Sequence, residues 1–252
     1  MNSETIKAAT DNFNLPHDVV PLPSGGIFYK NKKKSVKVGY LTASDENLIL
    51  SSLTNPNGNV VLTLIRNKLY EHDIKPEEML EGDIEAILLF LRNTSFGPEY
   101  TLNLTDPKTD KTFQASILLD ELNINRPKIQ PNENGYYEVK LPKSEMDVKI
   151  RPLTYGEIVE LDKLADSYPP GTVVPKITMK LMKQILEING VADKEKLSPI
   201  IYNLPIMDSK FIKNFILENE PSLDLKRTVK APSGELVSFD ITFGVDSFRP
   251  FF

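Results

Sequence analysis

The sequence predicts an α+β fold made of two similar units, each with a β-hairpin, about three helices and a second β-hairpin. The first observation behind this prediction is that the string Val36-Lys37-Val38-Gly39-Tyr40-Leu41-Thr42 recurs 112 residues later as Val148-Lys149-Ile150-Arg151-Pro152-Leu153-Thr154. The second is that the patterns after both strings come in the same order, which is typical of an internal repeat. A chance match between generic amphipathic segments is the alternative explanation.

Each unit is predicted to open with a β-hairpin. In the first unit, residues 27–29 precede a polar turn at residues 31–35, and apolar and polar residues alternate after that turn. In the second unit, residues 137–141 are joined to the next strand by a turn at residues 142–147. Alternation with a period of two indicates strands that bury one face.

Helices are predicted to follow both repeated strings. Thr42 has Asp45 three residues further on, and Thr154 has Glu157, so each pair can form a capping box at a helix start. Apolar residues with a helical spacing come next in both units. These are Val61, Leu62, Ile65 and Leu69 in the first unit, and Ile177, Leu181, Ile185 and Ile188 in the second.

A third helix and a closing hairpin complete each predicted unit. Asp83 and Asp208 precede apolar helical patterns and are predicted to be N-caps, 125 residues apart. The separation between equivalent positions thus grows from 112 residues at the repeated strings to 125 at these aspartates. The thirteen additional residues fit a longer loop around residues 168–171 of the second unit. The closing hairpins are predicted to turn at residues 106–110 and 231–235, where Pro, Gly, Asp and Ser gather.

These patterns divide the chain into two units with a connection between them and a segment at either end. The predicted parts are an N-terminal arm at 1–25, a first α+β unit at 26–122, a linker rich in Pro and Asn at 123–135, a second α+β unit at 136–246 and an aromatic C-terminal tail at 247–252.

Composition narrows the possible classes of protein. The 252 residues include 30 basic and 35 acidic ones, for a net charge of −5, and 40% are hydrophobic, which indicates a globular protein. The longest apolar run, six residues when Ala86 is counted with Ile87–Leu91, is far shorter than a membrane helix, and the first residues do not resemble a secretory signal. Without cysteine, the chain has no thiol nucleophile and no thiolate metal site.

The residues that could support catalysis or metal binding form no recognisable motif. His17 and His72 lie 55 positions apart in unrelated contexts, so no metal or cofactor is expected. Nucleotide-binding and nucleophile-elbow motifs are absent from the sequence. One acidic cluster could serve a hydrolase, although its spacing is typical of a helix start. It comprises Glu77, Glu78, Glu81, Asp83 and Glu85.

The strongest basic feature is the run Lys30-Asn31-Lys32-Lys33-Lys34. Clustered lysines attract phosphates, so a module associated with nucleic acid is one alternative function. However, no aromatic or arginine residue interrupts the run, and the protein as a whole is acidic. A solvated turn is the simpler interpretation.

Both ends of the sequence carry apolar residues outside any regular pattern, and they are predicted to contact partner proteins. Aromatic and arginine side chains dominate the centres of many interfaces, although the last residues could instead fold back onto the core. The candidate contact residues are Phe13, Leu15, Phe248, Arg249, Pro250, Phe251 and Phe252.

Several short motifs resemble the baseplate hub assembly proteins of T-even-type (T4-like) contractile-tailed bacteriophages. The motifs are Leu22-Pro23-Ser24-Gly25-Gly26-Ile27-Phe28-Tyr29, then Leu41-Thr42 with Glu46 and Leu50-Ser51-Ser52, then Gly82-Asp83-Ile84-Glu85-Ala86-Ile87-Leu88 with Leu91-Arg92, Ser95-Phe96-Gly97 and Tyr100, and finally Phe248-Arg249-Pro250-Phe251-Phe252. Two departures from the family pattern concern charge and metal. Ile84 stands where relatives often have Arg, and the hairpin turns lack the Cys pairs of some relatives, so no zinc is expected.

The resemblance implies a non-enzymatic phage tail protein that acts through protein–protein contacts. It would be a baseplate hub subunit or hub assembly factor, with hub or tape-measure proteins as partners and self-association possible. A chaperone that is absent from the mature particle is the alternative. The implied location is the host cytoplasm during assembly, and then the tail baseplate if the protein is retained. Neither a membrane nor nucleic acid is an expected partner.

Overall fold

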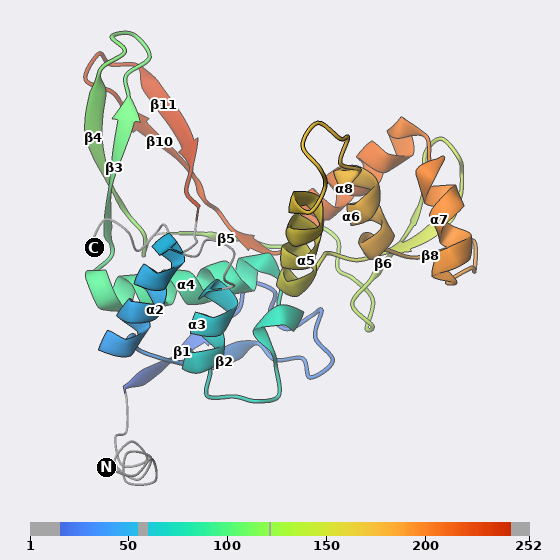
Figure 1. Cartoon of the computed structure of the whole chain (residues 1–252), viewed down its shortest axis with the longest axis horizontal. Coiled ribbons are helices and arrows are strands. Elements are labelled where there is room, and N and C mark those ends of the chain that lie inside the picture. Colours follow the sequence, from blue (N-terminus) through green and yellow to red (C-terminus); the bar gives the residue numbers. More distant parts are fainter. Residues whose placement is uncertain (1–15, 55–59, 121, 243–252) are drawn as a thin grey trace.

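The computed structural model describes residues 16–54, 60–120 and 122–242, and it has the predicted α+β fold (Figure 1). The elements of the N-terminal half are two strands, two helices, a short 3₁₀ helix, a long helix and a hairpin. They are β1 (His17–Pro21), β2 (Ser35–Gly39), α2 (Ala43–Thr54), α3 (Val60–Lys68), η1 (Pro76–Glu78), α4 (Glu81–Phe96), β3 (Glu99–Thr105) and β4 (Thr112–Leu118).

The C-terminal half has a similar order of elements with an additional helix and strand. Its elements are β6 (Tyr137–Lys140), β7 (Asp147–Ile150), α5 (Tyr155–Asp166), α6 (Lys176–Gln184), β8 (Ile185–Ile188), α7 (Lys194–Tyr202), α8 (Ile206–Asn219), β10 (Lys226–Lys230) and β11 (Leu236–Asp240). Two very short strands, β5 (Ile124–Asn125) and β9 (Ser222–Leu223), pair with each other and join the predicted linker to the end of α8.

The helix starts predicted after the repeated strings are present. Thr154 and Glu157 form a complete capping box at α5, because the Thr154 side chain accepts the Glu157 N–H and the Glu157 side chain accepts the Thr154 N–H. At α2 one of the two capping-box hydrogen bonds is present, because the Asp45 carboxylate accepts the Thr42 N–H at 2.7 Å. Asp45 also forms a buried ion pair with Lys68 of α3, which ties the two helices together.

The thirteen additional residues of the C-terminal half lie in two places. The connection from α5 to α6 has four residues more than that from α2 to α3, and the connection from α6 to α8 has nine more than that from α3 to α4. The prediction of one longer loop around 168–171 was therefore only partly right, because the larger share contains α7 where the first half has η1. The matching order supports the predicted duplication, which stays a prediction.

Four local predictions were wrong. Ile185 and Ile188, predicted to share a helix with Ile177 and Leu181, lie in strand β8, because α6 ends at Gln184. Residues 27–29 form turns rather than a strand, and the partner of β2 is β1, within the predicted N-terminal arm. Asp83 and Asp208 are not N-caps: each is the third residue of its helix, and Leu80 and Pro205 occupy the cap positions. Both carboxylates are fully buried because they hold a loop of their own half rather than a helix end.

Each half has its own hydrophobic core, and the two halves exchange aromatic side chains. Phe28 from the N-terminal half packs against the C-terminal core, with its ring centroid 6.1 Å from that of Tyr137. Tyr155 of α5 packs against the N-terminal core, and its backbone N–H donates to the Met79 carbonyl at 2.7 Å. Because of this exchange, neither core is complete without the other half.

Two glycines permit the close approach of the halves. A Cβ atom on Gly82 of α4 would lie 2.5 Å from the carbonyl oxygen of Pro221, and one on Gly156 of α5 would lie 2.7 Å from that of Glu77. Real Cβ atoms do not come so near to backbone atoms, so both positions require glycine for a steric reason. Gly82 belongs to the Gly-Asp string of the family resemblance, and the close approach of Pro221 gives a steric reason for a glycine at this position.

Candidate functional site

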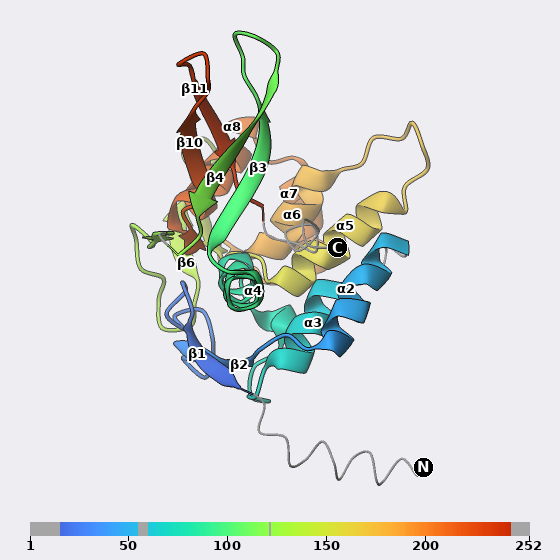
Figure 2. The same cartoon turned by 90° about the vertical axis from the view of Figure 1, so that its left-hand side faces the viewer.

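The most prominent feature of the molecule is a projection made of two β-hairpins, here called the paired-hairpin arm (residues 99–118 and 226–240). The β3–β4 and β10–β11 hairpins lie side by side and extend away from the helices (Figures 1 and 2). Both hairpins are antiparallel, with Glu99 opposite Leu118 and Lys226 opposite Asp240 at their bases. The arm thus combines one hairpin from each half of the chain.

The strands of the arm alternate as the sequence predicts, yet no strand residue is buried. One face of each hairpin is half-buried and mainly apolar, and the other is exposed and polar. On the polar faces, equivalent cross-strand pairs form hydroxyl hydrogen bonds, between Thr101 and Ser116 at 2.9 Å and between Thr228 and Ser238 at 2.8 Å. The half-buried residues are Tyr100, Leu102, Leu104, Phe113, Ala115 and Ile117 in the first hairpin, and Arg227, Val229, Val237 and Phe239 in the second.

A buried aspartate fastens the two hairpins together at their tips. The Asp106 carboxylate accepts hydrogen bonds from the Ser233 N–H at 3.0 Å, the Ser233 hydroxyl at 2.7 Å and the Lys108 N–H at 2.9 Å. Although loss of water alone would raise the pKa of Asp106, these hydrogen bonds outweigh it and hold the pKa below its usual value. The hairpins are therefore held together at the end farthest from the helices.

The base of the arm is anchored by Arg92, whose side chain is fully buried at the end of α4. Its guanidinium group donates to the carbonyl oxygens of Gly97 and of Glu99, the latter at 2.5 Å, and lies 5.1 Å from the centre of the Tyr100 ring. These contacts fix the direction in which β3 leaves the helix. Arg92 belongs to the family-like motif that the sequence analysis singled out, but its role is visible only in the structure.

Replacing Arg92 with alanine is expected to lower the free energy of unfolding by about 2–3 kcal/mol, because two carbonyl groups lose a charged donor and a cavity forms. Arg92→Lys retains the charge and one donor group, so we expect it to recover part of the loss. Urea denaturation of the full chain measures both. An unchanged midpoint for Arg92→Ala would contradict the anchoring role.

The arm also presents open backbone edges. Each hairpin is a separate two-stranded sheet, so in the described part of the chain every strand of the arm pairs on one side only. Open strand edges and half-exposed apolar faces are surfaces to which another chain can add a strand or pack. The arm is therefore suited to protein–protein contact.

An acidic cluster, formed by Glu81, Glu85 and Glu220, lies where α4 meets the C-terminal half. Loss of water raises the pKa of Glu85 on α4 to about 7 and that of Glu220, just after α8, to about 8, and repulsion from Glu81 adds to both shifts. Lys180 of α6 lies near the cluster and lowers the pKa of Glu220. Burial, together with Glu81 and Glu85, raises the pKa of Tyr155 to about 12.

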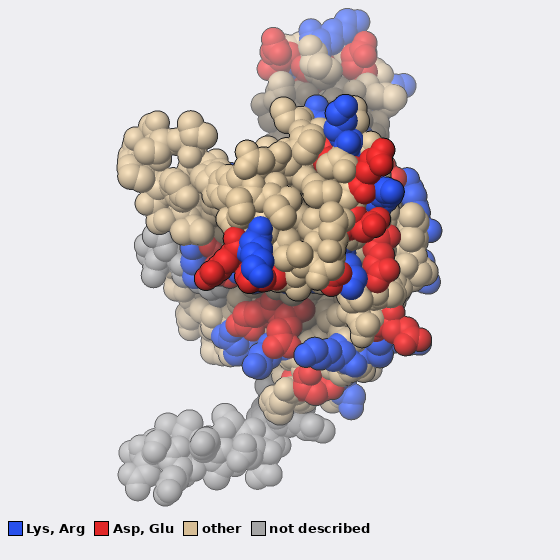
Figure 3. All heavy atoms as spheres, turned by 90° about the vertical axis from the view of Figure 1, so that its right-hand side faces the viewer, with Lys and Arg blue, Asp and Glu red and all other residues tan. Residues whose placement is uncertain are grey.

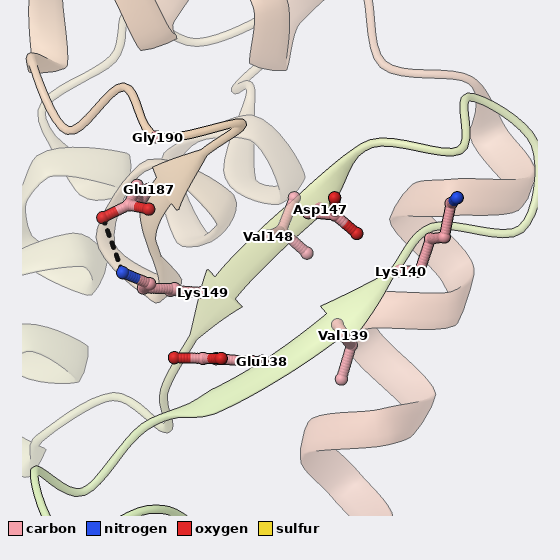
Figure 4. A pocket seen from close by; sticks show the side chains of 8 residues that line it. All are labelled: Glu138, Val139, Lys140, Asp147, Val148, Lys149, Glu187 and Gly190. Carbon is pink, nitrogen blue, oxygen red and sulfur yellow. Dashed lines mark hydrogen bonds and ion pairs between the residues drawn. The ribbon is translucent and has the colours of Figure 1, made fainter.

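A shallow pocket of about 230 Å³ lies on the sheet formed by β6, β7 and β8 (Figure 4). Lys149 forms an ion pair with Glu187 at 2.9 Å across the two strands, and Glu138 projects on the same side. The hydrogen bond to Glu187 raises the pKa of Lys149. A cross-strand ladder of paired charges accounts for these residues, and they form no nucleophile–base arrangement.

The sequence matches a known protein family. Residues 25–248 match the family described as T4 bacteriophage base plate protein, which covers most of the chain. The chain belongs to this family. Searches of curated proteins and of solved structures give no match.

Membership in the base plate family agrees with the resemblance found in the sequence and is consistent with a structural role in a phage tail. It implies contacts with other phage base plate proteins and suggests a component of the virion tail. None of the helices in the described ranges is long and apolar enough to cross a membrane.

The terminal residues predicted to contact partners lie outside the described residues. These are Phe13, Leu15, Phe248, Arg249, Pro250, Phe251 and Phe252. Their role in binding stays a prediction.

The lysine run lies in the β1–β2 connection, and two of its lysines bond within the protein. The Lys32 ammonium donates to the carbonyl oxygens of Ile27 and Glu133, at 3.0 and 2.7 Å, and Lys33 pairs with Asp73 at 2.5 Å. The contact with Glu133 joins the connection to the residues before β6, and the contact with Asp73 joins it to the segment after α3. They count against a phosphate-binding role for the run, because a lysine held by such bonds offers less of its charge to a ligand.

The acidic residues proposed for a hydrolase do not converge on one point. Glu77 pairs with Arg66, Glu78 lies 3.9 Å from Lys75, and Asp83 is buried within the N-terminal half. Glu81 and Glu85 instead cluster with Glu220, and the sequence did not indicate this cluster because Glu220 is distant in the chain. Within the described ranges, no group of three or more His, Cys, Asp or Glu residues is arranged to hold a metal ion.

Proposed function

We propose that this protein is a non-enzymatic subunit or assembly factor of the baseplate hub, and that the paired-hairpin arm is one of its contact surfaces. The supporting observation is the arm itself, which combines open strand edges with half-exposed apolar faces and is fastened at its tip and base. A rigid projection of this kind offers a preorganised surface to a partner, since little entropy is lost on binding. Membership in the base plate family supports the same role.

The proposed partners are hub or tape-measure proteins, met in the host cytoplasm during assembly. A chaperone that leaves before the particle is complete would need the same surfaces, so retention in the virion decides between the two forms of the proposal. The terminal residues, including Phe13 and the segment 248–252, are proposed as further contacts. Their aromatic side chains are typical of interface anchors.

Mass spectrometry of the tagged protein from infected cells, compared with purified particles, tests this proposal. Hub proteins in the extract together with the protein in the particle would indicate a structural subunit. Hub or tape-measure proteins in the extract without the protein in the particle would indicate a chaperone. The absence of both would contradict the proposal.

The contribution of the arm is tested in the same experiment with matched surface substitutions. Leu236 is 69% exposed near the tip of the arm, and Leu217 is 73% exposed on α8. We expect Leu236→Glu to reduce the recovery of hub proteins at least fivefold and Leu217→Glu to leave it unchanged, with equal melting temperatures. Deletion of residues 248–252 is expected to reduce recovery in the same way. Equal recovery with Leu236→Glu would remove the arm from the proposal.

A further inference from the structure

A second surface, distinct from the arm, lies on the C-terminal half between three helices. Helix α6 lies between α5 and α7 and contacts both (Figure 1). The three helices enclose a groove of about 240 Å³, here called the α5–α7 groove. Its lining residues are Leu161, Leu164, Met179, Met182, Lys183, Lys194, Leu197 and Ile201.

The groove has an apolar base and an apolar exposed side. Leu161, Leu197 and Ile201 are buried, whereas Leu164 is 48% exposed at the edge of the groove. Met179 and Met182 are half-buried between them. Figure 3 shows that this side of the molecule has a broad area without charged side chains, with charges gathered mainly along its border. Methionine side chains adapt to the shape of a partner, so the lining suits a protein ligand.

The charged residues of the lining are all basic. The lining contains two lysines, Lys183 and Lys194, and no acidic residue. Lys183 forms an ion pair at 2.9 Å with Glu160, which lies outside the lining and has a side chain that is 64% exposed. Lys194 is exposed at the start of α7. A ligand with apolar side chains and neighbouring carboxylates would match both features of the groove.

The helical walls determine the shape of the ligand. Helices use their backbone hydrogen-bonding groups internally, so the groove offers rows of side chains and no strand edge. A fourth helix fits such rows by placing its own side-chain ridges between them. An extended strand would leave its backbone groups unpaired against this apolar lining.

We propose that the α5–α7 groove binds an amphipathic α-helix of a partner protein, with an apolar row facing the methionines and acidic residues beside Lys183 and Lys194. This inference rests on the proposed role in protein–protein contact and names the chemistry of one partner segment. The arm and the groove would then bind different segments, one extended and one helical.

The test uses a displayed library of 18-residue peptides that have leucine at positions i, i+3, i+4 and i+7 and a random choice of Glu, Gln or Lys elsewhere. The library is selected against the full-length protein, and enriched peptides are measured by fluorescence anisotropy. We expect enriched peptides to be rich in Glu and to bind at least tenfold more weakly to Leu164→Glu and Met182→Glu. Leu217→Glu, on the exposed side of α8, is the matched control and should bind normally.

The contribution of the lysine charge is tested with two substitutions in α7. Lys194→Glu is expected to weaken binding of the Glu-rich peptides at least fivefold, whereas Lys196→Glu, which changes an exposed lysine outside the lining, is not. Melting temperatures confirm that the variants fold. No enrichment, enrichment of Lys-rich peptides, or binding that survives Leu164→Glu and Met182→Glu would each overturn the inference.

Self-association is measured separately. A concentration-dependent dimer that Leu164→Glu abolishes would assign the groove to a second copy and would also overturn the proposed partner. Because hub recovery from infected cells is an independent measurement, the proposed function can hold while the groove inference fails.

Discussion

Asp83→Ala is expected to lower the free energy of unfolding by about 3–4 kcal/mol, which is a large part of the stability of a typical domain. The side chain is fully buried, and its carboxylate accepts hydrogen bonds from the Ser24 N–H at 2.8 Å and from the Tyr29 hydroxyl. Tyr29 in turn accepts the Leu80 N–H at 2.9 Å. Alanine would leave two buried donors without their acceptor, and each costs about 1–3 kcal/mol.

The measurement is urea denaturation of the full chain at neutral pH, with Asp73→Ala as the control. Asp73 lies near the same connection, but its side chain is 55% exposed and pairs with Lys33 at the surface. Because exposed ion pairs contribute little, we expect Asp73→Ala to change stability by less than about 1 kcal/mol. Equal effects of the two substitutions would show that Asp83 does not hold the β1–β2 connection.

Asp208 offers a second test, because it has the equivalent place in the C-terminal half. Its carboxylate accepts the N–H groups of Lys143 and Ser144, at 2.7 and 2.9 Å, in the loop between β6 and β7. In both halves, the third residue of the long helix thus holds the connection of the preceding hairpin. Asp208→Ala should be milder, at about 1–3 kcal/mol, since the Lys143 and Ser144 donors lie nearer to water.

The sequence was most informative where a local rule sufficed. The capping pair Thr154 and Glu157 predicted the start of α5, and alternation predicted β6, β7 and both hairpins of the arm. Periodicity and caps depend on neighbouring residues, so one chain is enough to read them.

Predictions failed where distant contacts decide the conformation. Tyr29 has the sequence pattern of a strand residue, but its hydroxyl donates a hydrogen bond to Asp83 and accepts one from the Leu80 N–H. Residues 27–29 therefore form turns. Asp83 has the spacing of an N-cap, although burial against the β1–β2 connection gives it another role. At the start of a helix, an acidic residue at the N-cap and one at the third helical position look alike in the sequence.

The candidate surfaces were only partly predictable for the same reason. The strands of the arm showed a normal hairpin pattern, but nothing in that pattern indicates that their apolar faces stay half-exposed. Residues that line the groove, such as Met182 and Leu197, were not singled out from the sequence, because the groove exists only where α5, α6 and α7 pack together.

Glu220→Gln is expected to stabilise the protein above pH 7 and to have little effect at pH 4. The folded protein holds the Glu220 proton up to a pKa of about 8, whereas in the unfolded chain the group ionises near 4.5. Between these two values the folded state binds more protons than the unfolded state, so stability falls as the pH rises. At pH 9 the side chain is ionised in both states, and the folded state bears the whole cost of a partly buried charge beside Glu81 and Glu85.

We expect Glu220→Gln to raise the free energy of unfolding by about 2 kcal/mol at pH 9. This is well below the free energy that corresponds to the full pKa shift, because the side chain is only half-buried. Melting temperature from pH 4 to pH 9 measures it. Glu218→Gln is the control, since Glu218 is exposed and pairs with Lys128 at 2.9 Å. A pH profile of Glu220→Gln parallel to that of the natural sequence would contradict the assignment.

Glu85→Gln should act in the same direction, since the pKa of Glu85 is raised to about 7. Glu81 repels both carboxylates, so neutralising either one changes the charge that the remaining acids experience. The double substitution should therefore raise the free energy of unfolding by less than the sum of the two single substitutions, because the effects of interacting neighbours are not additive. Since Glu85 lies on α4 and Glu220 lies in the C-terminal half, this pH dependence would report how firmly the two halves hold together.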